Sequence, residues 1–223
     1  MASVASRHSS HTNGVAKLHG EVTRRMAQPM WSGYPTYEAS IGSVTNGIHT
    51  RSWISLEMST LLTRYLDPLW GERSADTALW QRIDRIPDQE LWRVHEIRRE
   101  RLVHCARHRL AAQILQRGGV DAEISQAGEV LNPGVLTIGF SRRFATYKRA
   151  TLLLRDLGRL KRLLLDAKRP VQILLAGKAH PHDNEGKELI QQIVRFVRDT
   201  EVRQNVVFLC RWRVAWFRAP TCG

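Results

Sequence analysis

Apolar runs and the breaks between them divide the chain into a helical first part and an alternating last part. Three short runs rich in β-branched and large apolar residues predict buried strands at residues 135–140, 171–176 and 206–209. Residues 147–165 and 185–200, which lie between them, have the spacing of amphipathic helices. Strands that alternate with helices predict a parallel, doubly wound sheet, so the fold class is α/β.

The residues before the first strand are predicted to be largely helical. Apolar side chains recur at helical spacing over residues 15–26, 53–65, 77–85 and 89–117, and Asp88 is expected to cap the last of these helices. Asn-Gly pairs at residues 13–14 and 46–47 predict turns. His19 falls beside the apolar positions of the first helix, where a hydrogen-bonded histidine in the core or at its edge is favoured over a catalytic one.

Four cations follow the first predicted strand: Arg142, Arg143, Lys148 and Arg149. Ligands bind at the carboxyl ends of strands in α/β sheets, and the N–H groups of a helix start favour an anion there. Lys178 follows the next strand and reaches the same edge of the sheet if the connection is right-handed. The pattern predicts an anion site, best suited to phosphate, although a solvated basic helix start has the same spacing.

The composition adds a strong positive charge to this picture. The 223 residues include 34 Lys and Arg against 21 Asp and Glu, a net charge of +13, which suggests a polyanionic partner or a piece separated from an acidic remainder. The three cysteines share no metal-ligand spacing, which indicates reduced thiols. No apolar run approaches the ~18 residues that span a bilayer, and no signal core is present. We therefore expect a soluble, cytoplasmic protein without a membrane partner.

Two histidine patterns could hold a metal, but neither predicts one. His104 and His108 lie four residues apart on the arginine-rich helix at 89–117, and His180, His182 and Asp183 follow the second strand. Neither group shows the ligand set of a metal site, so we interpret the first as a solvated helix face and the second as a polar turn.

Four motifs together resemble one enzyme family. They lie at residues 13–19 (Asn-Gly-Val-Ala-Lys-Leu-His), 45–48 with Arg51 and Trp53 (Thr-Asn-Gly-Ile), 143–149 (Arg-Phe-Ala-Thr-Tyr-Lys-Arg) and 176–179 (Ala-Gly-Lys-Ala). In order and spacing they resemble the α-glucan (glycogen, starch and maltodextrin) phosphorylases. These glycosyltransferases make glucose 1-phosphate from an α-1,4-glucan and orthophosphate. The resemblance covers residues 11–209, roughly a quarter of a full-length enzyme.

The resemblance implies two Rossmann-like domains of the GT-B type, with pyridoxal phosphate in the cleft between them. Residues 1–45 would then end the N-terminal domain, 46–133 would form the helical start of the C-terminal domain, and 134–209 would form its βαβαβ sheet. The complete enzyme would act in carbohydrate metabolism, and family members can be allosteric and oligomeric.

The resemblance also assigns individual residues. Arg143 and Lys148 match residues that bind the substrate phosphate, and Arg142 matches a basic position near the cofactor phosphate, which relays a proton to the substrate phosphate. Asn46 matches the asparagine that bonds the glucose 6-hydroxyl, and Val15 matches a residue that lines the glucose pocket.

Two departures from the family pattern lead to further expectations. Nothing matches the upstream glycine loop and glucose-binding histidine, or the downstream Glu-Ala-Ser-Gly-Thr segment and the lysine that carries the cofactor. The chain by itself is therefore expected to be inactive and to bind no pyridoxal phosphate. After Leu209, Cys210-Arg211-Trp212 replaces the family's acidic segment, which predicts that residues 210–223 are an aberrant tail read out of frame.

Two alternative functions stay open on the sequence. The net charge and the arginine-rich helices suit a basic nucleic-acid-binding module, although no recognised nucleic-acid motif appears. A different glycosyltransferase with two Rossmann domains would share the fold, but it would lack the spacing from Arg143 to Lys148.

Overall fold

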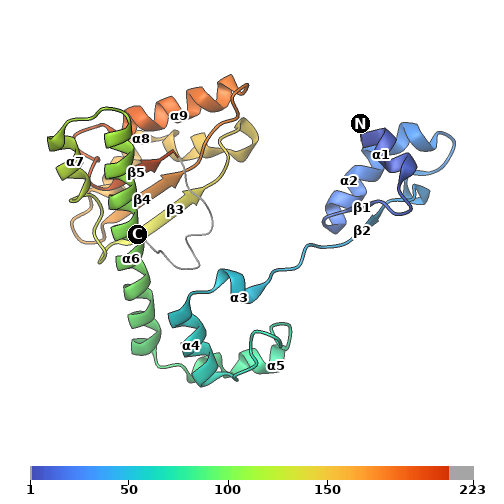
Figure 1. Cartoon of the computed structure of the whole chain (residues 1–223), viewed down its shortest axis with the longest axis horizontal. Helices are drawn as coiled ribbons and strands as arrows, with labels where there is room; N and C mark the ends of the chain where they lie inside the picture. Colours follow the sequence, from blue (N-terminus) through green and yellow to red (C-terminus); the bar gives the residue numbers. More distant parts are fainter. Residues whose placement is uncertain (1, 211–223) are drawn as a thin grey trace. The chain divides into compact units, whose positions relative to one another are not determined.

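The computed structural model in Figure 1 describes residues 2–210, except for the side chains of Ala2, Ser3, Thr146 and Thr151. The chain forms two compact units, of which the first ends at Thr50 and the second begins at Arg51. Among the described residues, no helix is both long enough and apolar enough to cross a bilayer. The predicted aberrant tail lies outside the described residues apart from Cys210.

The first unit packs one helix against a two-stranded parallel ladder. Its elements are α1 (Ala2–His8), β1 (Asn13–Gly14), α2 (Lys17–Ala27) and β2 (Gly42–Ser43), with 3₁₀ turns at Gln28–Trp31 and Thr36–Glu38. A Cβ on Gly14 would lie 2.7 Å from the Cα of Gly20, so glycine is needed where β1 meets α2. The predicted turn at residues 13–14 is therefore wrong, because these residues form a strand. Residues 44–49 are irregular, so the predicted turn at 46–47 is also wrong.

The second unit begins with helices, some of which enclose a small apolar core of their own. The helices are α3 (Thr50–Trp53, at the unit boundary), α4 (Leu56–Tyr65), α5 (Thr77–Trp80), α6 (Asp88–Gln116) and α7 (Asp121–Ala127), with a 3₁₀ turn at Gln81–Arg85. The predicted helix at 53–65 is divided because Ser55 caps α4, its hydroxyl accepting from the Met58 N–H. Pro87, and not Asp88, occupies the N-cap of α6. Helices α4, α5 and the start of α6 enclose the core of this part, which comprises Leu61, Leu62, Leu66, Trp70, Leu79 and Ile86.

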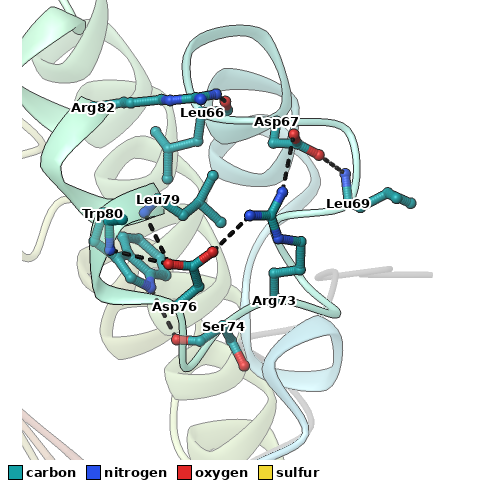
Figure 2. A network of polar contacts seen from close by, with 10 residues as sticks. Leu66, Asp67, Leu69, Arg73, Ser74, Asp76, Leu79, Trp80 and Arg82 are labelled. Carbon is teal, nitrogen blue, oxygen red and sulfur yellow. Dashed lines mark hydrogen bonds and ion pairs between the residues drawn. The ribbon is translucent and has the colours of Figure 1, made fainter.

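A polar network fixes the connection between α4 and α5 (Figure 2). The Asp76 carboxylate accepts from the N–H groups of Ala78 and Leu79 at 3.0 and 3.3 Å, which caps α5. Arg73 donates to the same carboxylate at 2.6 Å and lies 3.6 Å from Asp67. The hydrogen bond from Arg73 is the main reason why the pKa of Asp76 is lowered.

Three parallel strands form the sheet of the second unit. They are β3 (Leu136–Ser141), β4 (Val171–Ala176) and β5 (Val206–Leu209), in the order β3-β4-β5. Leu136 lies opposite Val171, and Ile173 lies opposite Val206. The predicted parallel sheet is confirmed, and the observed bounds of β4 and β5 match the prediction.

Helices cover both faces of this sheet (Figure 1). Along β4, side chains alternate between the faces: Ile173 and Leu175 pack toward α8 (Leu157–Leu164) and α9 (Asn184–Val197), while Leu174 and Ala176 pack against α6. The sheet is therefore the middle layer of three. β4 and β5 are buried on both faces, as their continuous apolar runs indicate. β3 lies at the edge of the sheet and its residues are exposed or half-buried, so the prediction of a buried first strand is wrong.

The helix predicted at 147–165 does not exist as one element. Two 3₁₀ turns, Thr146–Lys148 and Ala150–Leu154, flank Arg149, whose φ of 57° lies in the left-handed region. The α-helix begins only after Asp156, whose carboxylate accepts from the Arg159 N–H at 2.8 Å. An α-helix N-terminus therefore does not contribute to the predicted anion site.

Candidate functional site

The segment that follows β3 runs beside the segment that follows β4. The N–H of Arg142 donates to the Ala176 carbonyl at 3.2 Å, and the N–H of Phe144 donates to the Lys178 carbonyl at 3.0 Å. Arg143 lies between these two bonds and its side chain is exposed. The prediction that Arg143 and Lys178 reach the same edge of the sheet is confirmed at the level of the main chain.

Phe144 anchors this segment in the core. Its side chain is fully buried, and its ring centroid lies 5.9 Å from that of Phe140 and 5.7 Å from that of Phe208. Glycine is needed around it: a Cβ on Gly177, whose φ is 151°, would overlap the Arg142 carbonyl oxygen, and a Cβ on Gly186 would lie 2.5 Å from the Phe144 oxygen. The cations on either side of Phe144 are thus carried by a tightly packed main chain.

Several cations follow the strand ends at this edge of the sheet, and one carboxylate, that of Asp183, lies near Phe144: a Cβ on Gly186 would be 2.5 Å from the Phe144 oxygen and 2.9 Å from Asp183 Oδ2. In the described part of the chain, the exposed side chains of Arg142, Arg143 and Lys178 make no ion pair or hydrogen bond. Lys148 is half-buried, and its Nζ lies 4.7 Å from the centroid of the Tyr147 ring. Unpaired guanidinium and ammonium groups are suited to a phosphate, which can accept several charge-assisted hydrogen bonds.

The chain turns between Arg143 and Lys148. The N–H of Lys148 donates to the Ala145 carbonyl at 2.9 Å, which closes the first 3₁₀ turn. The two cations are therefore not separated by an extended strand. The positive charge of their side chains, without the dipole of an α-helix, is what makes this edge attractive to an anion.

The first unit brings the two predicted sugar-binding residues together. The N–H of Asn46 donates to the Val15 carbonyl at 3.2 Å, next to a bond of 2.9 Å from the Val44 N–H to the Gly14 carbonyl. Val15 is half exposed. Val15 and Asn46 belong to the unit 1–50, whereas Arg142, Arg143 and Lys148 belong to the unit that begins at Arg51.

His19 is a residue whose role the sequence did not indicate. It is exposed, and its Nδ1 accepts a hydrogen bond of 3.1 Å from the Val15 N–H. Its ring is therefore satisfied by a structural hydrogen bond, as the interpretation from the sequence expects, but it does not lie in the core. The sequence did hold one signal for this contact: His19 follows Val15 by four residues, and α2 begins between them. A side chain in the first turn of a helix can bond a main-chain N–H just before the helix, as in a capping box.

Several arginines of α6 are used within the fold. Arg98 and Arg101 form ion pairs with Glu57 on α4, and Arg107 donates to the carbonyls of Val130 and Leu131 at 2.8 and 2.7 Å. Burial alone raises the pKa of Glu57, but its main-chain hydrogen bond and the two arginines together lower it. The interpretation of this helix face as merely solvated is wrong for these residues.

The histidine patterns do not form metal sites. Among the described residues, no group of three or more His, Cys, Asp or Glu is placed to hold a metal ion. The His180 Nδ1 instead accepts from the His182 N–H at 3.2 Å, as in the polar turn that the sequence predicts.

Comparison with known proteins shows to which family the chain belongs. A sequence model of the carbohydrate phosphorylase family matches residues 1–218. The chain belongs to the carbohydrate phosphorylase family. This family is one of glycosyltransferases with the GT-B fold, and its members use pyridoxal phosphate.

Curated relatives match nearly the whole chain. The glycogen phosphorylase of Mycobacterium tuberculosis is 42% identical over 98% of the chain, and the maltodextrin phosphorylase of Thermococcus litoralis is 35% identical over all of it. The glycogen phosphorylase of Aquifex aeolicus is 38% identical over 91%. The chain spans only 25–29% of the lengths of these relatives.

Proposed function

We propose that the chain is part of an α-1,4-glucan phosphorylase. In this reaction the glycosidic bond at the end of a glucan breaks, and a bond forms between the anomeric carbon and an oxygen of orthophosphate. The proton that orthophosphate gives up passes to the departing glycosidic oxygen, which becomes a hydroxyl of the shortened glucan. The products are glucose 1-phosphate and a glucan shorter by one unit. Family membership and the unpaired cations at the carboxyl end of the sheet support this proposal.

Arg143 and Lys148 are the proposed ligands of the substrate phosphate. Arg143 offers a planar fork for two phosphate oxygens, and Lys148 offers a point charge. Each charge-assisted contact contributes about 1.5–3 kcal/mol. Phosphate approaches the anomeric carbon as the glycosidic bond breaks, so these contacts become stronger in the transition state. Part of their energy therefore raises kcat as well as the affinity for phosphate.

Arg142 is the proposed contact of this chain with the phosphate of pyridoxal phosphate. Its main-chain N–H is held by Ala176, while its exposed guanidinium has no partner in the described part of the chain, which suits a phosphate ligand. When bound, pyridoxal phosphate would supply an acidic phosphate group for proton transfer to and from the substrate phosphate. Arg142 would favour the charged form of such a group and orient it.

Asn46 and Val15 are the proposed contacts with the glucosyl unit. The side-chain amide of Asn46 would hydrogen-bond the 6-hydroxyl, and Val15 would pack against the sugar. Their main chains are already joined by the bond from the Asn46 N–H to the Val15 carbonyl. A pocket that hydrogen-bonds a hydroxyl discriminates against a sugar that lacks it.

The wider organisation is also part of the proposal. Residues 1–45 would end one Rossmann-like domain, residues 46–133 would lead into the next, and residues 134–209 would begin its sheet. The complete polypeptide would be cytoplasmic and could associate into oligomers.

The observation that carries the proposal is the pair of cations Arg142 and Arg143, which have no partner among residues 2–210 and follow the packed ends of β3 and β4 in a chain of this family. The test is the product formed by the complete polypeptide that carries this stretch. With an α-1,4-glucan and orthophosphate, we expect glucose 1-phosphate whose formation depends on orthophosphate. Release of free glucose at a rate independent of orthophosphate would show a hydrolase and contradict the proposal.

The structure weakens the nucleic-acid alternative. Arg98, Arg101 and Arg107 are engaged with Glu57 or with main-chain carbonyls, so the arginine-rich helix offers fewer free cations than the sequence suggests. A nucleic-acid complex whose affinity fell log-linearly with salt would restore this alternative.

A further inference from the structure

His19 reaches from α2 back to the loop that carries Val15. The Val15 N–H donates to His19 Nδ1 at 3.1 Å, and the Val15 carbonyl accepts from the Asn46 N–H at 3.2 Å. Val15 is therefore held on both sides, by an imidazole at its N–H and by Asn46 at its carbonyl. Because Nδ1 accepts, the neutral imidazole carries its proton on Nε2.

The helix that carries the imidazole is itself fixed. The residue after His19, Gly20, lies so close to β2 that a Cβ on it would be 2.9 Å from the Ser43 Cβ. Gly14 pairs with Ser43 in the ladder of β1 and β2. The helix, the ladder and the Val15 loop are thus locked to one another, and the imidazole has a defined place in which to accept the Val15 N–H.

We propose that His19 is a positioning residue for the glucose site. Its ring holds the main chain of Val15, and Val15 in turn holds the main chain of Asn46, whose side chain we assign to the 6-hydroxyl. This inference rests on the proposed function and deepens it, because it adds a residue that determines how well the site recognises that hydroxyl. Small displacements of a hydrogen-bonding group are enough to lose such discrimination.

The first experiment compares two sugar phosphates in the complete phosphorylase polypeptide that carries this stretch. In the direction of glucan synthesis, the ratio of kcat/KM for glucose 1-phosphate over 6-deoxyglucose 1-phosphate measures recognition of the 6-hydroxyl. A neutral hydrogen bond makes this ratio on the order of three- to tenfold. The variant His19→Ala is expected to bring the ratio close to one, because Asn46 is no longer held in place.

Two conservative variants separate positioning from a general loss of structure. In His19→Asn the side-chain oxygen lies close to the place of Nδ1, so the ratio should be kept. In His19→Gln the acceptor lies near the place of Nε2, so the ratio should fall as it does for His19→Ala. Thr23→Val is the matched control: it removes the hydrogen bond of 2.6 Å from Thr23 Oγ1 to the His19 carbonyl, which lies within α2 and does not involve the imidazole, so the ratio should stay unchanged.

A second readout does not depend on activity. Amide hydrogen exchange at Val15 in the 223-residue chain should become faster in His19→Ala and His19→Gln, but not in His19→Asn, by about the factor by which the protecting bond is weakened. Unchanged exchange at Val15 in His19→Ala would overturn the inference, because the bond would then not hold the loop.

Different results would contradict the role of His19 and the proposed function. A parent polypeptide that forms no glucose 1-phosphate contradicts the proposed function. A parent that is active, with a selectivity ratio that stays the same in His19→Ala and His19→Gln, overturns only the role of His19. If His19→Ala does not fold, the contrast between His19→Asn and His19→Gln decides.

Discussion

Replacing Gly177 by alanine should break the junction that carries the phosphate-site cations. A Cβ at this position would overlap the Arg142 carbonyl oxygen and lie 2.9 Å from Cε2 of the buried Phe144 ring. The φ of 151° is in addition a conformation that an alanine rarely adopts. Because both neighbours are fixed, the ends of β3 and β4 would have to separate by roughly 1 Å or more.

The energetic cost of this separation has two sources, broken main-chain hydrogen bonds and overpacking. The bonds that break are the one from the Arg142 N–H to the Ala176 carbonyl and the one from the Phe144 N–H to the Lys178 carbonyl. Each bond contributes about 0.5–1.5 kcal/mol, and the overpacking adds about 1–3 kcal/mol. We therefore expect the free energy of unfolding of the sheet unit to fall by about 2–6 kcal/mol.

The assay is urea unfolding of the 223-residue chain, followed together with amide exchange at residues 142 and 144. Gly139→Ala is the matched control: Gly139 lies in β3, and a Cβ on it would meet no heavy atom within 4 Å. That variant should be neutral or slightly stabilising, by up to about 1 kcal/mol. Equal midpoints and equal exchange in the two variants would refute the claim that the Gly177 contact holds the cation-bearing segment.

Three further predictions concern the ion pairs and the cofactor. Glu57→Gln should lower the free energy of unfolding by about 1 kcal/mol at neutral pH by removing the ion pairs with Arg98 and Arg101. Since the folded-state pKa of Glu57 is below its ordinary 4.5, the difference from the parent in urea unfolding should vanish as the pH falls through that pKa. Arg73→Ala should raise the pKa of Asp76 toward its ordinary value, which an NMR titration of the carboxyl carbon measures; an unchanged pKa would exclude Arg73 as the main cause. Borohydride reduction of the purified chain with pyridoxal phosphate should trap no stoichiometric pyridoxyl group on a single lysine, and one such group would contradict the expectation that the cofactor lysine is missing.

The second and third strands could be predicted from the sequence because their burial is continuous. Residues 171–176 and 206–209 are apolar runs covered on both faces, so both bounds were predicted correctly. The first strand was placed one residue too early, since Val135 is half-buried and pairs with the turn at Asn132 rather than with β4.

The helix after the first strand could not be predicted in the same way. Leu152, Leu153 and Leu154 look helical by composition, but they form a 3₁₀ turn because Arg149 adopts a left-handed conformation before them. Asp156 was the available signal, since an Asp before an apolar helical repeat is a typical N-cap. The anion site therefore stays a prediction for Arg142, Arg143 and Lys148, but one of its reasons, the helix start, was incorrect.

The contacts that tie the site together depend on residues far apart in the chain. No local pattern shows that the Phe144 N–H meets the Lys178 carbonyl, or that Glu57 pairs with Arg98 and Arg101 on another helix. The role of His19 was missed because apolar spacing describes what a helix buries, whereas this ring lies outside the core and bonds the main chain of Val15.

The central claim is that Arg143 and Lys148 bind the substrate phosphate, and the most direct test is the orthophosphate dependence of glucan phosphorolysis in the complete polypeptide. Arg143→Ala and Lys148→Ala should each lower kcat/KM for orthophosphate by at least about tenfold, the equivalent of one charge-assisted contact. Arg149→Ala, which removes a neighbouring cation from the same segment, should have a much smaller effect. Equal kcat/KM in the parent and all three variants would contradict the account and remove Arg143 and Lys148 from the phosphate site.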